Sequence, residues 1–124
     1  MLSINYKDPR PIYEQVRDAL RQLILSGAIA PGEKLPSVRE LAASLAINPN
    51  TIQRSYRELE KLGLVNTVAG KGAFAATDGT AALRWREELM AMLSSTLREL
   101  KLLGVSESEL QSMVLAVFRK EDET

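Results

Sequence analysis

The side chains of this chain that could do chemistry are amides, hydroxyls, guanidinium groups and a lysine, and they gather between residues 35 and 74. One short segment supplies most of them: Asn48, Asn50, Thr51, Gln53 and Arg54. Amide and hydroxyl groups suit the edges of nucleic-acid bases, whereas Arg39, Arg54 and Lys71 suit phosphate oxygens. These residue types therefore favour recognition by contact rather than the making or breaking of bonds.

The residues that most catalytic and metal-binding sites need are missing. The sequence has no cysteine and no histidine, which excludes thiolate and imidazole metal ligands, disulfides, cysteine nucleophiles and histidine bases. Glu58 and Glu60 stand two residues apart on an expected helix, so they face different directions and cannot form an acid/base pair. Gly70-Lys71-Gly72 is too short for the phosphate-binding loop of nucleotide-binding proteins. We predict no enzyme activity, no cofactor and no metal site.

Composition and charge are consistent with a small folded protein. The 124-residue chain is 45% hydrophobic and 26% charged, as expected for one domain with a small appendage. No long apolar run and no leader peptide is recognisable, so we expect a cytoplasmic protein without a membrane span. The net charge is zero, but residues 1–78 carry four Lys and six Arg against three Asp and five Glu. This mild excess permits a basic face on the first part of the chain.

Three helices are expected before residue 64. The first has apolar residues at helical spacing and is closed by Gly27: Ile12, Val16, Leu20, Leu23 and Ile24. A short extended stretch, 33–35, follows a turn. Ser37 and Glu40 have the capping-box spacing and predict the start of a second helix, and Asn48-Pro49 predicts the start of a third.

The third helix and the segment after it predict a surface for duplex DNA. Ile52, Tyr56, Leu59 and Leu62 form its apolar stripe, which leaves the polar residues on the opposite face. Strands at 64–68 and 73–75 then flank a glycine-rich tip. A helix of this kind fits the major groove, which is about 12 Å wide, and a glycine-tipped hairpin can approach a phosphate or the minor groove closely.

Residues 79–124 carry no chemical motif, but their pattern predicts a two-helix hairpin. A long leucine-rich helix begins at Asp78 or Thr80 and ends at Gly104, and the Ser106/Glu109 capping box starts a final helix. Two helices cannot bury so much apolar surface between them, so a partner surface is required. The simplest partner is a second copy related by a two-fold axis. A small effector could be held between the helices of such a dimer, but no polar cluster there identifies it.

Several motifs in a fixed order give a family resemblance: Leu35-Pro36-Ser37-Val38-Arg39-Glu40-Leu41-Ala42, Asn48-Pro49-Asn50-Thr51-Ile52, Tyr56-Arg57-Glu58-Leu59-Glu60, Gly63-Leu64-Val65 and Gly70-Lys71-Gly72-Ala73-Phe74. Over residues 11–75 the chain resembles the GntR (gluconate-repressor) family, and its short helical tail is similar to the YtrA-like subfamily. The resemblance implies a mainly α fold. A winged helix-turn-helix, with three helices and a β-hairpin wing, would span residues 1–78, and a dimerisation hairpin would span 79–124.

The resemblance also implies which residues touch DNA. Arg39 matches a family arginine that contacts DNA, and Gly70 and Lys71 match the tip of the wing. Pro49 and Gln53 stand where other branches often have arginine, so the preferred base-reading set is Asn48, Asn50, Thr51 and Arg54. The implied function is repression of a transporter operon by a homodimer that binds a pseudo-palindromic operator.

Plainer interpretations remain open for single residues. Arg39 could instead pair with Glu40 or Glu58, Asn48 could serve only as a helix cap, and the glycine-rich tip could be an ordinary turn. The alternative function is a winged-helix adaptor that binds proteins, since the fold alone does not fix the function. An adaptor should present an acidic or apolar face on the third helix, and this sequence predicts a polar, partly basic one.

Overall fold

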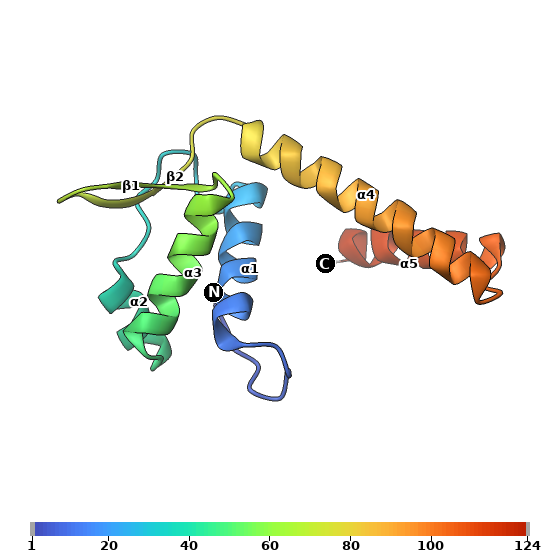
Figure 1. Ribbon diagram of the computed structural model, residues 1–124, viewed down its shortest axis with the longest axis horizontal. Coiled ribbons are helices and arrows are strands. Elements are labelled where there is room, and N and C mark those ends of the chain that lie inside the picture. The colour runs from blue at the N-terminus through green and yellow to red at the C-terminus, as the bar shows by residue number, and fades with distance from the viewer. Residues whose placement is uncertain (1, 124) are drawn as a thin grey trace. The chain divides into compact units, whose positions relative to one another are not determined.

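The computed structural model describes residues 2–123, with the side chains of 2–120, and its elements follow the predicted order (Figure 1). They are α1 (Ile12–Ser26), α2 (Val38–Leu45), α3 (Pro49–Lys61), β1 (Val65–Val68), β2 (Gly72–Ala75), α4 (Thr80–Leu102) and α5 (Glu107–Glu123). The two strands form an antiparallel hairpin in which Val65 pairs with Ala75 and Val68 with Gly72. The predicted mainly helical architecture with a hairpin wing is confirmed. The chain divides into two compact units, one ending at Arg84 and one beginning at Trp85.

Local signals set the ends of the first three helices. The Ser37 hydroxyl accepts the Glu40 N–H at 3.1 Å, and the Glu40 carboxylate accepts the Ser37 N–H at 3.4 Å, which completes the expected capping box at α2. The Asn48 side chain accepts the Asn50 N–H at 2.8 Å, with Pro49 at the first helical position. Gly27 ends α1 in the left-handed conformation that glycine adopts without steric cost.

The core of the first unit lies where α3 packs against α1, α2 and the hairpin (Figure 1). Its buried hydrophobic side chains come from every element of the unit: Val16, Leu20, Leu35, Leu41, Ala42, Ile52, Tyr56, Leu59, Leu64, Val65, Ala75 and Ala81. Full burial of a large aliphatic side chain stabilises a fold by about 1.5–3 kcal/mol. This core therefore holds α3 and the hairpin in a fixed geometry.

The first turn of α4 belongs to the first unit. Ala81 is buried there, and the Arg84 guanidinium lies 3.5 Å from the carbonyl oxygen of Leu62 at the end of α3. The sequence pattern places the division at residue 78, shortly after the hairpin, whereas the first compact unit extends to Arg84. The difference arises because a helix start can pack on one unit while the rest of the helix belongs to another.

The short stretch before α2 pairs with the wing. Lys34 forms a bridge with Phe74 of β2, the Leu35 N–H donates to the Ala73 carbonyl at 2.9 Å, and the Ala75 N–H donates to the Glu33 carbonyl at 2.9 Å. The extended 33–35 stretch thus acts as a third, minimal strand. It ties the wing directly to the start of α2.

The second unit has a different character. The α4 helix ends near Gly104, whose φ of 86° allows the chain to turn, and the Ser106 hydroxyl accepts the Glu109 N–H at the start of α5. None of the side chains described between residues 85 and 120 is buried. The exposed large hydrophobic residues include Met90, Leu93, Leu97, Met113, Val117 and Phe118. Within residues 2–123, no helix is long and apolar enough to cross a membrane.

Candidate nucleic-acid interface

The polar face of α3 is exposed, as its spacing predicts. Asn50, Gln53, Arg54 and Arg57 are exposed, and Thr51 is half-buried. The opposite face is buried in the core: Ile52, Ser55, Tyr56 and Leu59. The helix therefore presents amide and guanidinium groups on its exposed face, while its opposite face packs in the core.

Two buried contacts fix the rotation of α3 against its neighbours. The Ser55 hydroxyl donates to the carbonyl of Tyr13 in α1 at 2.8 Å, and the Tyr56 hydroxyl donates to the carbonyl of Pro36 at 2.6 Å. Burial, with a smaller effect of the Glu40 carboxylate, raises the pKa of Tyr56 to about 12. The hydroxyl therefore stays protonated and keeps donating at physiological pH.

Arg54 is held by a neighbouring helix. Its guanidinium lies 3.7 Å from the centre of the Tyr13 ring, a cation–π geometry. Guanidinium hydrogens that point along the ring plane remain available for a phosphate or base. This contact was not anticipated from the sequence, because Tyr13 and Arg54 lie in different helices.

Asn48 and Arg39 have distinct surroundings at the starts of their helices. The side-chain Oδ1 atom of Asn48 accepts the Asn50 N–H, so the first role of this side chain is that of a helix cap. Arg39, the second residue of α2, is exposed, and among the described residues it makes no ion pair with Glu40 or Glu58. Its charge is thus available to an external anion.

The arginines in α1 and just before it are engaged with acidic residues. Asp18 accepts from Arg10 at 2.8 Å, from Arg17 at 3.0 Å and from Arg21 at 2.9 Å. A hydrogen bond from the Arg10 backbone, together with its guanidinium, lowers the pKa of Asp8. Much of the basic charge of this helix is therefore offset within the unit.

The tip of the wing is open and basic. Gly70 has a φ of 75°, and a Cβ atom added to it would meet nothing within 4 Å. Lys71 beside it is exposed, and its N–H donates to the Val68 carbonyl at 3.0 Å. A backbone so free of side chains can approach another molecule closely.

A groove of about 400 Å³ lies between the start of α2, the exposed face of α3 and the wing. Of the predicted contact residues, the groove brings together Gln53, Gly70 and Lys71, whereas Arg39, Asn48, Asn50, Thr51 and Arg54 do not line it. Two basic residues that sequence reasoning left out, Lys34 and Arg57, also line it. The helical spacing of the sequence places Arg57 on the polar face, one turn after Gln53, although the predicted set of contact residues omits it.

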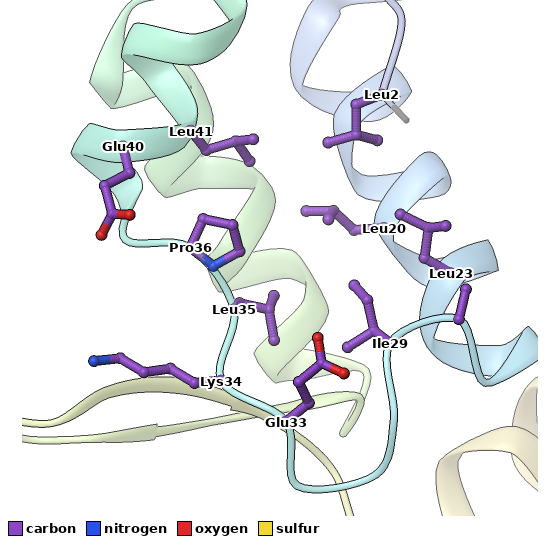
Figure 2. A pocket seen from close by; sticks show the side chains of 11 residues that line it. Leu2, Leu20, Leu23, Ile29, Glu33, Lys34, Leu35, Pro36, Glu40 and Leu41 are labelled. Atoms are coloured by element: carbon purple, nitrogen blue, oxygen red, sulfur yellow. The ribbon is translucent and has the colours of Figure 1, made fainter.

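A second pocket, of about 500 Å³, lies between α1, the start of α2 and the segment 28–36 (Figure 2). Its wall is mostly aliphatic, with Leu20, Leu23 and Ile29 among its lining residues. Two carboxylates, Glu33 and Glu40, line it together with Lys34, which also lines the groove beside α3. An aliphatic wall with an acidic excess repels a polyanion, so the groove beside α3 is the one that suits DNA.

Comparison with known sequences agrees with this geometry. Residues 12–75 match the family described as bacterial regulatory proteins, gntR family. The HTH-type transcriptional repressor YtrA of Bacillus subtilis (strain 168) is 39% identical over 100 residues, which are 81% of this chain and 75% of that protein. The expected resemblance to the GntR family and to YtrA is confirmed.

Solved structures lead to the same group. A GntR family transcriptional regulator from Listeria monocytogenes is 34% identical, with a TM-score of 0.74 over 88% of this chain and 96% of that chain. The DNA-binding domain of AraR, solved in complex with operator ORX1, is 30% identical, with a TM-score of 0.56 over 60% of this chain and 96% of that chain. These relatives are regulators of transcription rather than enzymes.

Proposed function

This chain belongs to the GntR family of bacterial DNA-binding transcription regulators, and on that basis we propose that it represses transcription as a homodimer bound to a pseudo-palindromic operator. The resemblance to the YtrA-like branch suggests a transporter operon as the target. Such a protein works in the cytoplasm, where chromosomal DNA lies. In this proposal residues 1–78 read the operator and residues 79–124 join the two copies.

The observation that carries the DNA-reading role is the exposed polar face of α3 next to the groove and the wing. Asn50 and Gln53 offer donors and acceptors that suit base edges, and Thr51 adds a hydroxyl at the half-buried border of the face. Arg39, Arg54 and Lys71 supply the positive charges that suit phosphates. Asn48 contributes by capping the start of α3, which fixes the position of the neighbouring Asn50 relative to the bases.

The homodimer is supported by the uncovered apolar surface of the second unit. Met90, Leu93, Leu97 and Leu100 follow the three-four-three spacing of a coiled-coil seam on α4, and α5 carries its own stripe. These side chains are exposed or half-buried in the single chain. Apolar surface of this extent is typical of a protein interface, and a two-fold axis lets the same surface serve both copies.

A two-fold dimer has a geometric consequence for the operator. Two α3 helices related by that axis would enter successive major grooves, so the half-sites should lie about one helical turn apart. Each first unit alone would bind weakly, because it would contact one half-site only. An effector would act most directly between the two copies, where it could change the spacing of the helices.

The test is selection of bound duplexes from a random pool, followed by titration of the enriched site with variants. We expect a two-fold symmetric site. Arg39→Ala and Lys71→Ala should weaken binding to all sequences and reduce the salt dependence, with the slope of log K against log salt falling by about 0.9 for each lost phosphate contact. Asn50→Ala should instead cost about 1–3 kcal/mol on the preferred site and little on others.

Lys61→Ala is the matched control, because Lys61 is exposed at the end of α3 but lies outside the groove. It should leave the salt dependence nearly unchanged. Unchanged slopes for Arg39→Ala and Lys71→Ala would contradict the phosphate contacts. Failure of the whole chain to enrich any sequence would favour the adaptor, whose partner would then have to fit a polar and basic α3 face.

A further inference from the structure

The groove beside the wing contains three positive charges, and the contacts proposed above account for only one of them, Lys71. Lys34 approaches it from the stretch before α2, Arg57 from the second half of α3, and Lys71 from the tip of the wing. All three are exposed, and among the described residues none of them forms an ion pair. Three elements distant in the sequence thus bring unpaired positive charges to one depression.

The backbone and a glycine fix the position of Lys34. Its strand-like bridge with Phe74 holds the main chain against β2. A Cβ atom on Gly72 would lie 3.0 Å from Lys34 Cε and 3.8 Å from its Nζ, so the lysine stem passes close over this glycine. The absence of a side chain at residue 72 therefore gives the stem room to lie along the base of the wing.

One acidic residue shares the groove. Glu60 lines it, and its Oε2 atom accepts the Thr67 hydroxyl at 2.8 Å, which links the end of α3 to strand β1. A hydroxyl partner leaves the negative charge in place, so the groove holds three cationic groups and one anionic group. An anion in the groove would be attracted to the lysines and Arg57 and repelled by Glu60.

We infer that this groove seats one strand of the DNA backbone, with Lys34 and Arg57 as phosphate-binding residues and Glu60 as a charge that weakens the same contact. The inference rests on the proposed DNA-binding function and adds the path of the backbone to it. The groove is open and its cations come from separate elements, an arrangement that suits a continuous polyanion. A single phosphate would prefer convergent N–H donors, as in a nest of backbone amides.

The experiment uses the full chain with isosteric or neutralising changes at the three positions, and it measures binding to the selected operator and to a random duplex over a range of salt concentrations. Lys34→Gln and Arg57→Gln should each weaken binding to both duplexes about five- to tenfold at 0.1 M salt and lower the salt slope by about 0.9. Glu60→Gln should act in the opposite direction and tighten binding to both duplexes. Its amide oxygen can still accept the Thr67 hydroxyl, so the wing keeps its anchor.

Controls separate this inference from its premise. Lys61→Gln removes the same charge outside the groove and should change neither affinity nor slope by as much as Lys34→Gln. Thermal unfolding of each variant checks that folding is intact, and Glu60→Gln serves as a gain-of-binding readout that misfolding cannot produce. Inorganic phosphate at millimolar concentration should compete no better than its ionic strength predicts, because the groove fits a strand rather than a free ion.

The outcomes distinguish two failures. If the chain binds its operator with a steep salt dependence but Lys34→Gln and Glu60→Gln both leave affinity unchanged, the backbone does not run through the groove and the inference is wrong. If phosphate alone competes specifically, the groove is an ion site and the inference is also wrong. If the unchanged chain binds no duplex, the proposed function itself fails.

Discussion

The two units of this chain use hydrophobic residues in opposite ways. In the first unit Val16, Ile52 and Leu59 are completely buried. In the second, Leu97 is 38% exposed and Phe118 is 66% exposed. Both units contain amphipathic helices with similar residues, so composition does not explain the contrast. The number of elements does: three helices and a hairpin can close around a core, whereas two helices leave their apolar stripes uncovered.

This contrast separates two requirements for reading DNA. For the proposed DNA contacts, the first unit has to hold Asn50, Arg54 and the wing in fixed positions, and it has a buried core of its own to do so. In the proposed homodimer the second unit would set the distance between the two copies, because its exposed apolar surface would be covered when a second copy packs against it. We therefore expect substitutions in the first core to lower the free energy of unfolding at every protein concentration. Substitutions on the apolar surface of the second unit should instead lower dimerisation, and their effect should depend on protein concentration.

The largest effect should come from making the apolar face of the second unit charged. Leu93→Glu places a carboxylate within the α4 stripe and should prevent dimerisation, since a buried unpaired charge is strongly unfavourable. Loss of the second half-site should lower operator affinity about a thousandfold, or about 4 kcal/mol. Analytical ultracentrifugation and titration of the operator measure the two effects.

Ser95→Glu is the control for this change, because Ser95 is exposed on the same helix but lies outside the stripe. It adds the same charge and should leave mass and affinity nearly unchanged. A wild-type chain that sediments as a monomer at micromolar concentration would contradict the comparison itself, since the apolar face would then be exposed without a partner.

The next effect compares one leucine from each unit. Leu59→Ala removes a completely buried side chain from the first core and should lower the free energy of unfolding by about 3 kcal/mol. Leu97→Ala should cost little in a dilute single chain and progressively more as the concentration rises, because its contacts form only in the dimer. Urea unfolding followed by circular dichroism at two protein concentrations tests this. An equal and concentration-independent loss for both variants would remove the distinction between the units.

The sequence predicted the features that depend on neighbouring residues. The caps at Ser37 and Asn48, the glycine at the end of α1 and the apolar stripe of α3 all rest on spacings of a few residues, and all are confirmed. The family resemblance is confirmed as well. These signals are local, so a pattern of residue types is enough to predict them.

The features that sequence reasoning missed depend on residues far apart in the chain. Ser55 bonds to a carbonyl 42 residues away. Lys34 reaches the groove because it pairs with Phe74, and the Arg54 guanidinium rests on a ring in another helix. Gln15 is buried because its amide binds the backbone of Asn5. No local pattern predicts such pairs, since each needs the tertiary fold before the partners meet.

A smaller effect should come from the buried hydroxyl of Tyr56 in the first unit. Tyrosine in an unfolded chain titrates near pH 10, and in the fold the pKa is raised to about 12. The stability from the protonated hydroxyl is thus complete below pH 10 and is lost as the pH rises from 10 to 12. Tyr56→Phe should cost about 1 kcal/mol at neutral pH and should remove this part of the alkaline loss.

Urea unfolding from pH 7 to 12 measures both predictions for Tyr56. The difference in stability between the wild type and Tyr56→Phe should shrink as the pH rises past 10. A constant difference over the whole range would mean that Tyr56 titrates normally and is not held by Pro36. Operator binding at neutral pH should change little, because the phenyl ring of the variant still fills the same place in the core.

The smallest effect concerns the turn between α2 and α3. Ala46 has a φ of 55° and is the one non-glycine residue with a positive φ among the residues that the structure describes. This left-handed conformation costs an L-residue about 1 kcal/mol. Ala46→Gly removes that cost, but glycine has greater conformational freedom in the unfolded chain, which offsets part of the gain in stability. We expect a gain of about 0.5 kcal/mol.

Ala43→Gly, on the exposed side of α2, is the matched control and should lose about 1 kcal/mol, since its backbone is helical. The same substitution three residues apart should therefore have opposite signs in thermal unfolding. If both variants lose stability equally, Ala46 is not left-handed in solution, and the angle that sets α3 against α2 must come from the core alone.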